Sequence, residues 1–356
     1  MLIRYHNLSL PLEFTFTISR GSSVEAKTVY VEIVAEYKKK TYVGLGEAVP
    51  AIFYGEDQQS VGRFYDQLTL DHALSDLDPF NHQAFEARLA RYPGNMAAKS
   101  ALDMALYDLR GKILKQPTWK LLGLDATSAP KTSYTIGIAD LDTVIHKTRT
   151  ALRRGYDILK VKVGSPDDLE TLNAIRNLAP EATIRADANA AWTLAEALEL
   201  LPELAALGVE FVEEPLKLDS SEDDYDTLFE KTPLPLMADE SCKTLGDIPR
   251  CAEFFHAINL KHTKTGGLSE ALRMIHAARA HELKIMLGCF CESSISISAF
   301  AQLSPLADYA DLDGALLLAQ DPYQGVTFKG SQIILNNKAG LGVSPLNINK
   351  TLATPG

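Results

Sequence analysis

Short apolar runs alternate with longer amphipathic stretches along the chain between residues 132 and 317. Between most of the runs, stretches such as 168–179 and 194–208 repeat apolar residues every three or four positions, as amphipathic helices do. Strands that alternate with helices predict a parallel sheet whose faces are covered. The expected strands lie at 132–138, 158–163, 182–188, 209–215, 234–240, 257–262, 284–290 and 310–317.

Eight strands at a regular step of about 25 residues favour a closed barrel over an open, doubly wound sheet. After residues 310–317 the chain continues as QDPYQGVTF, which lacks the pattern of an eighth helix. We therefore predict an α/β fold of the (β/α)7β type, a modified TIM barrel.

The first part of the chain has a different pattern. Residues 28–48 alternate polar and apolar residues as an antiparallel meander does, and we expect Gly44 and Gly46 at its turns. Helical stretches follow at 56–70 and 95–114. An α+β domain thus precedes the barrel.

These patterns divide the chain into three parts. We predict a capping domain over residues 1–125, the barrel over residues 126–319, and a C-terminal return, residues 320–356, that packs on the cap. No low-complexity linker separates cap and barrel, which predicts a tight interface.

Composition narrows the possible partners. The 356 residues are 46% hydrophobic and 23% charged, as in an ordinary globular protein, and the net charge of −11 argues against nucleic acid or an anionic membrane surface. No apolar run is long enough to span a bilayer, and the first residues show no signal-peptide pattern. We expect a cytoplasmic protein and, because symmetric homo-oligomers are the common case, a homo-oligomer.

Four cysteines are too few for a disulfide framework. We therefore expect small buried or pocket-lining residues at Cys242, Cys251, Cys289 and Cys291.

Charged residues stand at the ends of six of the eight expected strands, where barrel enzymes place their chemistry. One charged strand end is usually part of a solvated rim, but six in the same register indicate a site. They are Lys160 and Lys162, Asp187 (with Asn189), Glu213 and Glu214, Asp239 and Glu240, Lys261, and Asp311 and Asp313.

Three consecutive strands offer carboxylates that can form one oxygen-rich cage. Asp187 and Asp239 supply two of them, and either Glu213 or Glu214 supplies the third, because neighbouring residues on a strand alternate in direction. Hard divalent cations such as Mg²⁺ accept this ligand set, and no His or Cys set favours zinc.

Lysines flank this cage on both sides. Lys160 and Lys162 are two residues apart, so both point to the same side of their strand, and Lys261 lies on the strand beyond the carboxylates. Burying an ammonium group is costly unless it is paired or discharged. We expect burial and a nearby cation to lower the lysine pKa, so that one lysine removes a proton from carbon and the opposite lysine returns one to the other face. Lys160 would hold a substrate oxygen.

Taken together, KVKVG, ADANAAW, VEEP, ADES and NLKHTKTGG closely resemble the muconate-lactonising subgroup of the enolase superfamily. SALDMALYDLRGKILKQPTWKLLG also resembles that group's helix between cap and barrel, and the resemblance covers essentially the whole chain. It implies an enediolate mechanism with Mg²⁺. It also implies that the metal ligands are Asp187, Glu213 and Asp239, that Lys162 and Lys261 are the acid/base pair, and that Lys160 binds the substrate carboxylate.

The subgroup contains cycloisomerases, o-succinylbenzoate synthases, N-acylamino acid racemases and dipeptide epimerases. Asp311 and Asp313 favour the last, because dipeptide epimerases hold the substrate's α-ammonium group with such a pair and other substrates have no cation to satisfy it. The resemblance suggests that Thr135 and Cys289 line the peptide site. We therefore expect Mg²⁺-dependent epimerisation of a dipeptide at its C-terminal residue. The alternatives are another enzyme of the subgroup, a binding protein on an inactive barrel, and a solvated loop for the aspartate pair.

Substrate choice is expected to come from two cap loops, residues 16–26 and 51–60. Members of the subgroup that act on Ala-Glu carry an arginine at the place that corresponds to Gly21 here. We therefore do not expect a strict preference for glutamate, although a shift of one residue would put Arg20 at that place and restore the match. Candidate selecting side chains are Phe53, Tyr54 and Cys289 for an apolar substrate residue and Glu25 or Glu56 for a cationic one; ordinary packing is the alternative.

Overall fold

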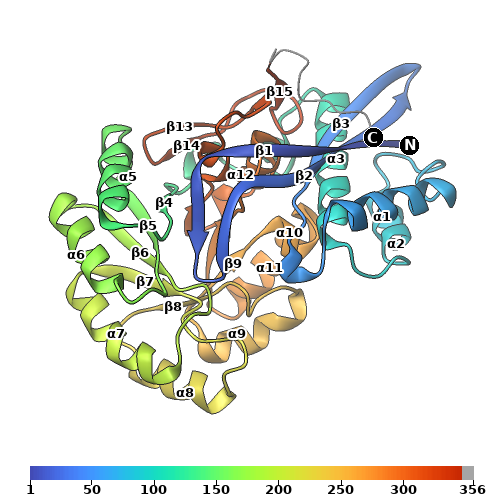
Figure 1. Ribbon diagram of the computed structural model, residues 1–356. Coiled ribbons are helices and arrows are strands. Elements are labelled where there is room, and N and C mark those ends of the chain that lie inside the picture. The colour runs from blue at the N-terminus through green and yellow to red at the C-terminus, as the bar shows by residue number, and fades with distance from the viewer. Residues whose placement is uncertain (347–356) are drawn as a thin grey trace.

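The structure, a computed structural model, describes residues 1–346. Its N-terminal part is an antiparallel sheet of β1 (Leu2–Ile18), β2 (Gly21–Tyr37) and β3 (Lys40–Ala48). The β1–β2 hairpin is longer than the sequence predicted: Phe16 pairs with Ser23, so residues 16–26 are the end of a hairpin and not a loop. Figure 1 shows this end of the hairpin bending from the cap sheet onto the barrel.

Three helices complete the cap: α1 (Gln58–Leu70), α2 (His82–Leu89) and α3 (Met96–Leu114). Gly44 and Gly46 lie inside β3 and not at turns, which corrects the expectation above. A Cβ on Gly44 would lie 1.9 Å from the carbonyl oxygen of Ala105, and one on Gly46 would lie 2.0 Å from that of Ala101. These glycines therefore allow α3 to approach the strand closely.

The second part is an eight-stranded parallel sheet with strands in chain order. The first and last strands meet where Ser133 N donates to Ala310 O at 3.1 Å, so the sheet closes into a barrel. The strands are β4 (Tyr134–Ile136), β5 (Ile158–Lys162), β6 (Thr183–Asp187), β7 (Val209–Glu213), β8 (Leu236–Ala238), β9 (Ala257–Leu260), β10 (Lys284–Gly288) and β11 (Tyr309–Asp311).

Helices follow seven of these strands and cover the outside of the barrel (Figure 1). Side-chain caps stabilise the starts of α5, α7, α8 and α12; Thr193 and Glu196, for example, form a reciprocal capping box at the N-terminus of α7. The helices are α5 (Leu141–Arg153), α6 (Asp168–Leu178), α7 (Leu194–Ala206), α8 (Glu222–Lys231), α9 (Ile248–Phe254), α11 (Leu268–Ala280), which the short α10 (His262–Thr265) precedes, and α12 (Ser294–Ala301).

The last barrel strand is shorter than expected. Residues 310–317 were predicted as a strand, but β11 ends at Asp311 and residues Gly314–Leu317 form a 3₁₀ turn. A Cβ on Gly314 would lie 1.9 Å from the carbonyl oxygen of Phe290, so the chain turns tightly against its neighbour here. No eighth helix follows in the described residues, and the (β/α)7β fold with an N-terminal cap is confirmed.

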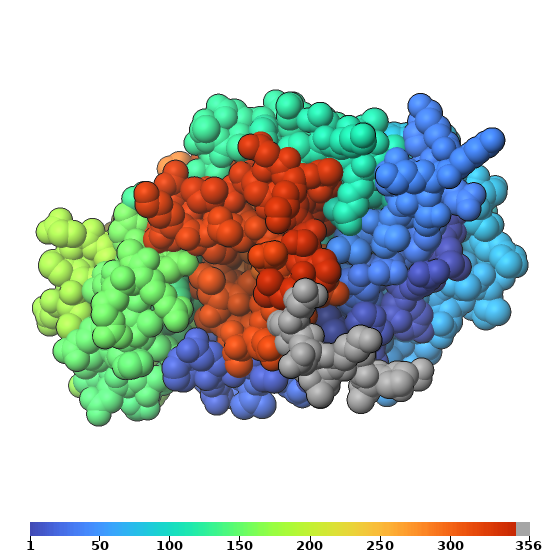
Figure 2. All heavy atoms as spheres, turned by 90° about the horizontal axis from the view of Figure 1, so that it is seen from above, coloured from blue at the N-terminus to red at the C-terminus, as the bar shows by residue number. Residues whose placement is uncertain are grey.

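The C-terminal segment contacts both parts. Tyr323 stacks on Tyr30 of the cap sheet with 5.6 Å between ring centroids, and Leu341 N donates to Asp108 of α3 at 2.8 Å. Figure 2 shows this segment, in red, between the cap in blue and the early barrel segments in green. The domain boundaries at residues 125 and 319 stay predictions, and the part of the predicted return from 347 to 356 lies outside the described residues. Among residues 1–346, every helix is too short or too polar to cross a membrane.

Candidate active site

Two lysines of β5 enter the barrel mouth from the same side. Lys162 Nζ donates to Asp187 Oδ2 at 2.6 Å, and Lys160 Nζ lies 3.0 Å from the same oxygen. Lys160 also donates to Asp311 Oδ2 at 2.7 Å and is almost completely buried. The structure thus answers why an apolar strand carries two lysines: both are paired with acids that other strands supply.

A third lysine enters from the opposite side of these acids. Lys261 follows β9, and the strands β6, β7 and β8 lie between β9 and β5 in the sheet. Its Nζ donates to Asp239 Oδ2 at 2.7 Å and lies 5.0 Å from the centre of the Phe290 ring. Lys162 and Lys261 therefore approach the carboxylates of β6, β7 and β8 from opposite ends of this set of strands.

Two of the lysines have raised pKa values because carboxylates surround them. Burial would lower the pKa of Lys160, but the carboxylates of Asp187, Asp311 and Glu213 outweigh it and hold that pKa well above its ordinary value. Burial and Asp239 oppose each other in the same way at Lys261, and its pKa is also raised. The carboxylates alone thus raise the pKa of both lysines, and the lowering expected from burial together with a bound cation stays a prediction.

Three carboxylates stand at the ends of adjacent strands. Asp187 ends β6, Glu213 ends β7, and Asp239 follows β8 directly. Glu213 faces inward, with Oε2 2.7 Å from Lys160 Nζ. Glu214 faces the other way and accepts hydrogen bonds from the backbone N–H groups of Asp239 and Ser241, which settles the choice that the sequence left open.

Among residues 1–346, no three His, Cys, Asp or Glu side chains are already arranged around a metal-binding point. The ammonium groups of the lysines occupy the carboxylates instead. The donor chemistry nevertheless fits a hard cation, because the set consists of buried carboxylate oxygen atoms from three adjacent strands, and Glu213 Oε2 has an ion-pair contact with Lys160 but no hydrogen bond among the described residues. Burial and the adjacent Asp187 raise the pKa of Glu213 to about 8, as expected for a carboxylate that lacks sufficient positive charge nearby.

The aspartate pair of the last strand lies beside the lysines. Asp311 accepts from Ser133 Oγ at 2.6 Å, and Asp313 accepts from Thr135 N at 2.6 Å and from Thr135 Oγ1 at 3.1 Å. Both aspartates are buried, so the solvated-loop alternative is wrong. Burial and the charge of Asp311 raise the pKa of Asp313 to about 7.

The cysteines divide into two kinds. Cys242 and Cys251 are buried, whereas Cys289 and Cys291 are half-buried, and all four are free thiols. The side chain of Cys289 lies against Gly314, next to the aspartate pair. Burial raises the pKa of its thiol. Small buried or pocket-lining residues are what the sequence predicted at these positions.

The hairpin of the cap closes on the mouth through Arg20. Its guanidinium donates to Asn189 O at 2.7 Å, lies 2.6 Å from Glu240 Oε1 and stacks over the Phe53 ring at 4.5 Å. Tyr54 is largely buried nearby, where burial and Asp239 raise the pKa of its hydroxyl. The charge of Arg20 is therefore already paired.

The two glutamates considered for a cationic substrate have other partners. Glu56 accepts hydrogen bonds from Met96 N and Ala97 N, so it caps the N-terminus of α3. Glu25 lies on the exposed part of the hairpin, 3.2 Å from Lys27. Neither is available to the mouth.

Sequence reasoning missed several buried polar residues that hold this site. Lys264 Nζ donates to Asp239 Oδ1 at 2.6 Å, and Asn259 Nδ2 donates to Glu213 Oε1 at 2.8 Å. Lys264 is visible in the motif NLKHTKTGG as a second lysine three residues after Lys261, but its contact with another strand has no local signal.

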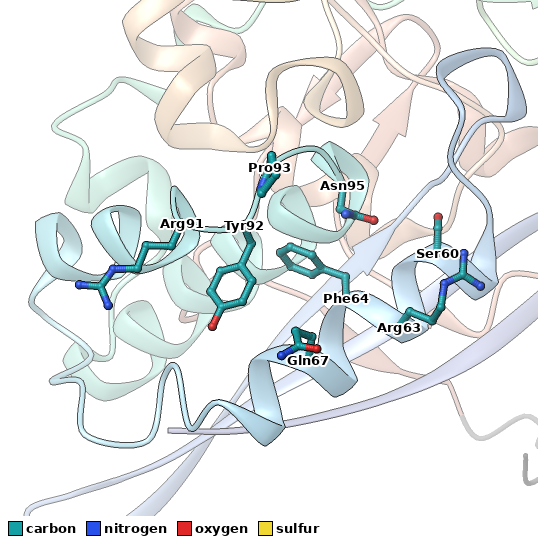
Figure 3. Close-up of a pocket in the computed structure, with 8 residues that line it drawn as sticks. All are labelled: Ser60, Arg63, Phe64, Gln67, Arg91, Tyr92, Pro93 and Asn95. Carbon is teal, nitrogen blue, oxygen red and sulfur yellow. The ribbon is translucent and has the colours of Figure 1, made fainter.

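The cap carries a separate hollow of about 390 Å³ (Figure 3). Phe64 and Tyr92 lie at its centre, whereas Arg91 points away from them. None of its lining residues is an expected site residue. They are Ser60, Arg63, Phe64, Gln67, Arg91, Tyr92, Pro93 and Asn95.

Two family profiles match the chain. The mandelate racemase/muconate lactonizing enzyme N-terminal domain matches residues 5–123, and the enolase C-terminal domain-like family matches residues 143–347. The chain therefore belongs to the mandelate racemase/muconate lactonizing enzyme group of the enolase superfamily. Its curated relatives are epimerases, so within this group it is an isomerase.

Three similar proteins show the range of this neighbourhood. An L-Ala-D/L-amino acid epimerase from Maribacter sp. is 36% identical, over 97% of this chain and 99% of its own. A dipeptide epimerase from Enterococcus faecalis, solved with Mg and the dipeptide L-Leu-L-Tyr, superimposes with a TM-score of 0.87 at 31% identity, over 96% of this chain and 99% of its own. An N-succinyl Arg/Lys racemase from Bacillus cereus also has a TM-score of 0.87, at 28% identity, over 97% of this chain and 95% of its own.

Proposed function

We propose that this protein is a dipeptide epimerase that inverts the α-carbon of the C-terminal residue. The observation that carries this proposal is the buried pair Asp311 and Asp313, in which Asp311 lies 2.7 Å from Lys160 Nζ and Asp313 accepts hydrogen bonds from Thr135. A dipeptide brings an α-ammonium group that can pair with two carboxylates, and a buried carboxylate without a cation is costly. Relatives that act on dipeptides support the same substrate class.

We propose Asp187, Glu213 and Asp239 as the ligands of Mg²⁺. Their oxygen chemistry, their complete burial and their place on adjacent strands support this assignment. When bound, the ion supplies positive charge that competes with the lysines for these carboxylates, lowers the lysine pKa values and stabilises negative charge on the substrate carboxylate.

Lys162 and Lys261 act as the acid/base pair in this proposal. A neutral amine on one side removes the α-proton, and the ammonium on the other side donates a proton to the opposite face of the resulting enediolate. Inversion follows because the two amines approach from opposite ends of the carboxylate set. Lys160 donates hydrogen bonds to the substrate carboxylate, and Thr135 and Cys289 line the peptide site.

The preferred C-terminal side chain need not be acidic. Arg20 could attract a substrate carboxylate, but Glu240 lies 2.6 Å from its guanidinium and offsets the charge. The exposed ring of Phe53 stands beside this pair. We propose that neutral or apolar C-terminal residues are accepted. The cytoplasm and a homo-oligomeric state stay predictions of the sequence.

Exchange in D₂O tests the proposal. The protein is incubated with Mg²⁺ and a library of L,L-dipeptides, and loss of the α-proton of the C-terminal residue is followed by NMR and mass spectrometry. We expect exchange together with formation of the L,D isomer. Absence of exchange for every dipeptide would contradict the proposal.

The second candidate is an N-acylamino acid racemase, or a cycloisomerase or o-succinylbenzoate synthase, of the same subgroup. The fold shared with the N-succinyl Arg/Lys racemase favours including it. A double variant, Asp311→Asn with Asp313→Asn, separates the candidates. Loss of dipeptide exchange supports the epimerase, whereas undiminished activity on N-succinyl amino acids supports the alternative.

A further inference from the structure

His262 follows Lys261 directly in the chain, and its ring is completely buried between the cap and the barrel. Nε2 lies 2.9 Å from Glu292 Oε2, and Nδ1 lies 3.0 Å from Ser100 Oγ on the cap helix α3. The ring also meets Phe300 edge-on at 5.8 Å. Both ring nitrogens and one ring face are thus fixed, which leaves the imidazole a single orientation.

The partners of His262 are held firmly in turn. Glu292 is completely buried, and the same oxygen that meets His262 lies 3.4 Å from Phe290 N. The Phe290 ring centre lies 5.0 Å from Lys261 Nζ. Glu292 therefore contacts both His262, which follows Lys261 in the chain, and the backbone of Phe290, whose ring lies beside the Lys261 ammonium. The tautomer with hydrogen on Nε2 donates to Glu292 and accepts from Ser100 Oγ at Nδ1, so it satisfies both contacts of the ring.

The cap reinforces the same segment at two further points. Thr263 Oγ1 donates to Val49 O at 3.1 Å, just after β3. Glu47 of β3 accepts from Ser293 N at 3.2 Å and from Ser293 Oγ at 2.6 Å, next to Glu292. The ends of β9 and β10 are therefore both tied to the cap, on the Lys261 side of the mouth.

We propose that His262, held between Ser100 and Glu292, is the positioning residue for Lys261. It does not contact the substrate in this arrangement; it fixes the backbone from which the Lys261 side chain extends. Ser100 and His262 then link the cap to Lys261, whereas the cap meets the Lys162 side separately, through Ser19 and Arg20 of the hairpin end. This inference rests on the proposed roles of Lys162 and Lys261.

In a two-lysine epimerase, the ratio of the exchange rates of the two stereoisomers is a readout that a general loss of stability does not change. Each lysine deprotonates one stereoisomer of the C-terminal residue, so the α-exchange rates of L,L and L,D dipeptides in D₂O report the two lysines separately. Lys162→Ala and Lys261→Ala identify which isomer belongs to which lysine.

The test variant is Ser100→Ala, which removes one hydrogen bond to His262 with little change of volume. We expect exchange of the isomer assigned to Lys261 to fall by about 10-fold or more, because misplacement of a reacting group by about 1 Å can cost about 100-fold. Exchange of the other isomer should stay within about 2-fold, and KM should change little. Glu292→Gln, which keeps the side-chain volume, should shift the ratio in the same direction.

The matched control is Ser269→Ala. Ser269 Oγ lies 2.7 Å from His82 Nε2, so this variant also removes a serine–histidine contact between barrel and cap, half-buried here and away from Lys261, together with a hydrogen bond to Asp103 at 2.8 Å. We expect it to leave the ratio of the two rates unchanged. Equal losses for both isomers in folded Ser100→Ala or Glu292→Gln protein, or an equal shift in the control, would overturn the positioning role. A wild-type protein that exchanges neither isomer would overturn the proposed function instead.

Discussion

The two sides of the barrel mouth are built differently. On the Lys261 side, Ser100, Glu47 and the carbonyl of Val49 connect the cap to the ends of two barrel strands. On the Lys162 side, the strand end is held within the barrel, where Gly164 N donates to Asp168 Oδ2 at 2.7 Å. The cap reaches this side through the hairpin end.

At the hairpin end, the cap contacts the loop that follows β6, where Arg20 donates to Asn189 O at 2.7 Å. Ser19 Oγ donates to Asn189 O at 3.2 Å, and a Cβ on Gly164 would lie 3.1 Å from Ser19 Cβ. One lysine thus depends on the cap for its position, and the other depends on the loop that follows its own strand. A site that looks symmetrical in its chemistry is supported asymmetrically.

The largest effect is expected from the lysines themselves. Replacing Lys162 or Lys261 with alanine should slow epimerisation by about 10²- to 10⁴-fold, because a positioned acid or base contributes about that much. The measurement is the rate of conversion between L,L and L,D dipeptides, followed by chiral chromatography. A variant that keeps more than about half of the wild-type rate would remove that lysine from the pair.

Loss of the metal should act on both sides alike. Glu213→Gln keeps the side-chain size and should lower the exchange rate of both isomers by about 10²- to 10³-fold, as loss of electrostatic stabilisation does. Removal of Mg²⁺ by a chelator should have the same effect on the wild type. Titration calorimetry with Mg²⁺ on the wild type and on Glu213→Gln checks the ligand assignment independently. Unchanged Mg²⁺ affinity in the variant would exclude Glu213 as a ligand.

The aspartate pair should affect binding without favouring a side. Asp313→Asn is expected to raise KM for dipeptides about 10- to 100-fold, equally for both isomers, because it removes one charge from the ammonium site. In the wild type, the pKa of Asp313 near 7 means that the carboxyl gains a proton as the pH falls below that value, so KM should rise on the acidic side. A KM that is flat from pH 8 to pH 6 would argue against an ammonium site here.

The smallest effect tests the Lys162 side. Gly164 has φ +109, and a Cβ there would lie 2.7 Å from Ala191 Cβ, so Gly164→Ala should reduce stability by about 1–3 kcal/mol. The exchange ratio should shift several-fold against the isomer assigned to Lys162, opposite to the shift in Ser100→Ala. Gly123→Ala, which has φ +72 and open space around it, is the control for backbone strain alone. The same direction of shift in Gly164→Ala and Ser100→Ala would refute the asymmetry.

Much of the fold could be predicted because its signals are local. The alternation of strand and helix patterns predicted the (β/α)7β barrel. Because alternate residues of a strand point to the same side, the spacing of Lys160 and Lys162 also predicted that both lie on one side of β5. The same period could not choose between Glu213 and Glu214, since that choice depends on how Glu214 contacts the backbone of the next strand. The length of the last strand was wrong because a tight turn at Gly314 ends it, which an apolar run does not reveal.

The parts that escaped prediction depend on contacts between distant segments. Gly44 and Gly46 were predicted at turns, but they allow α3 to pack closely against β3. Glu56 was a candidate substrate contact, but it caps the N-terminus of α3. His262 and Glu292 were not predicted as site residues, because their contacts join segments of the cap and the barrel that are distant in the sequence. Local patterns predicted which lysines and carboxylates meet at the mouth, and tertiary contacts determine how they are held.

The most direct test of the two-sided account is the pair of α-exchange rates in D₂O for one dipeptide in its L,L and L,D forms, measured on Lys162→Ala and Lys261→Ala with Mg²⁺. The account predicts mirror images: each variant loses exchange of one isomer and retains exchange of the other. Loss of both isomers in both variants, or of the same isomer in both, would contradict it.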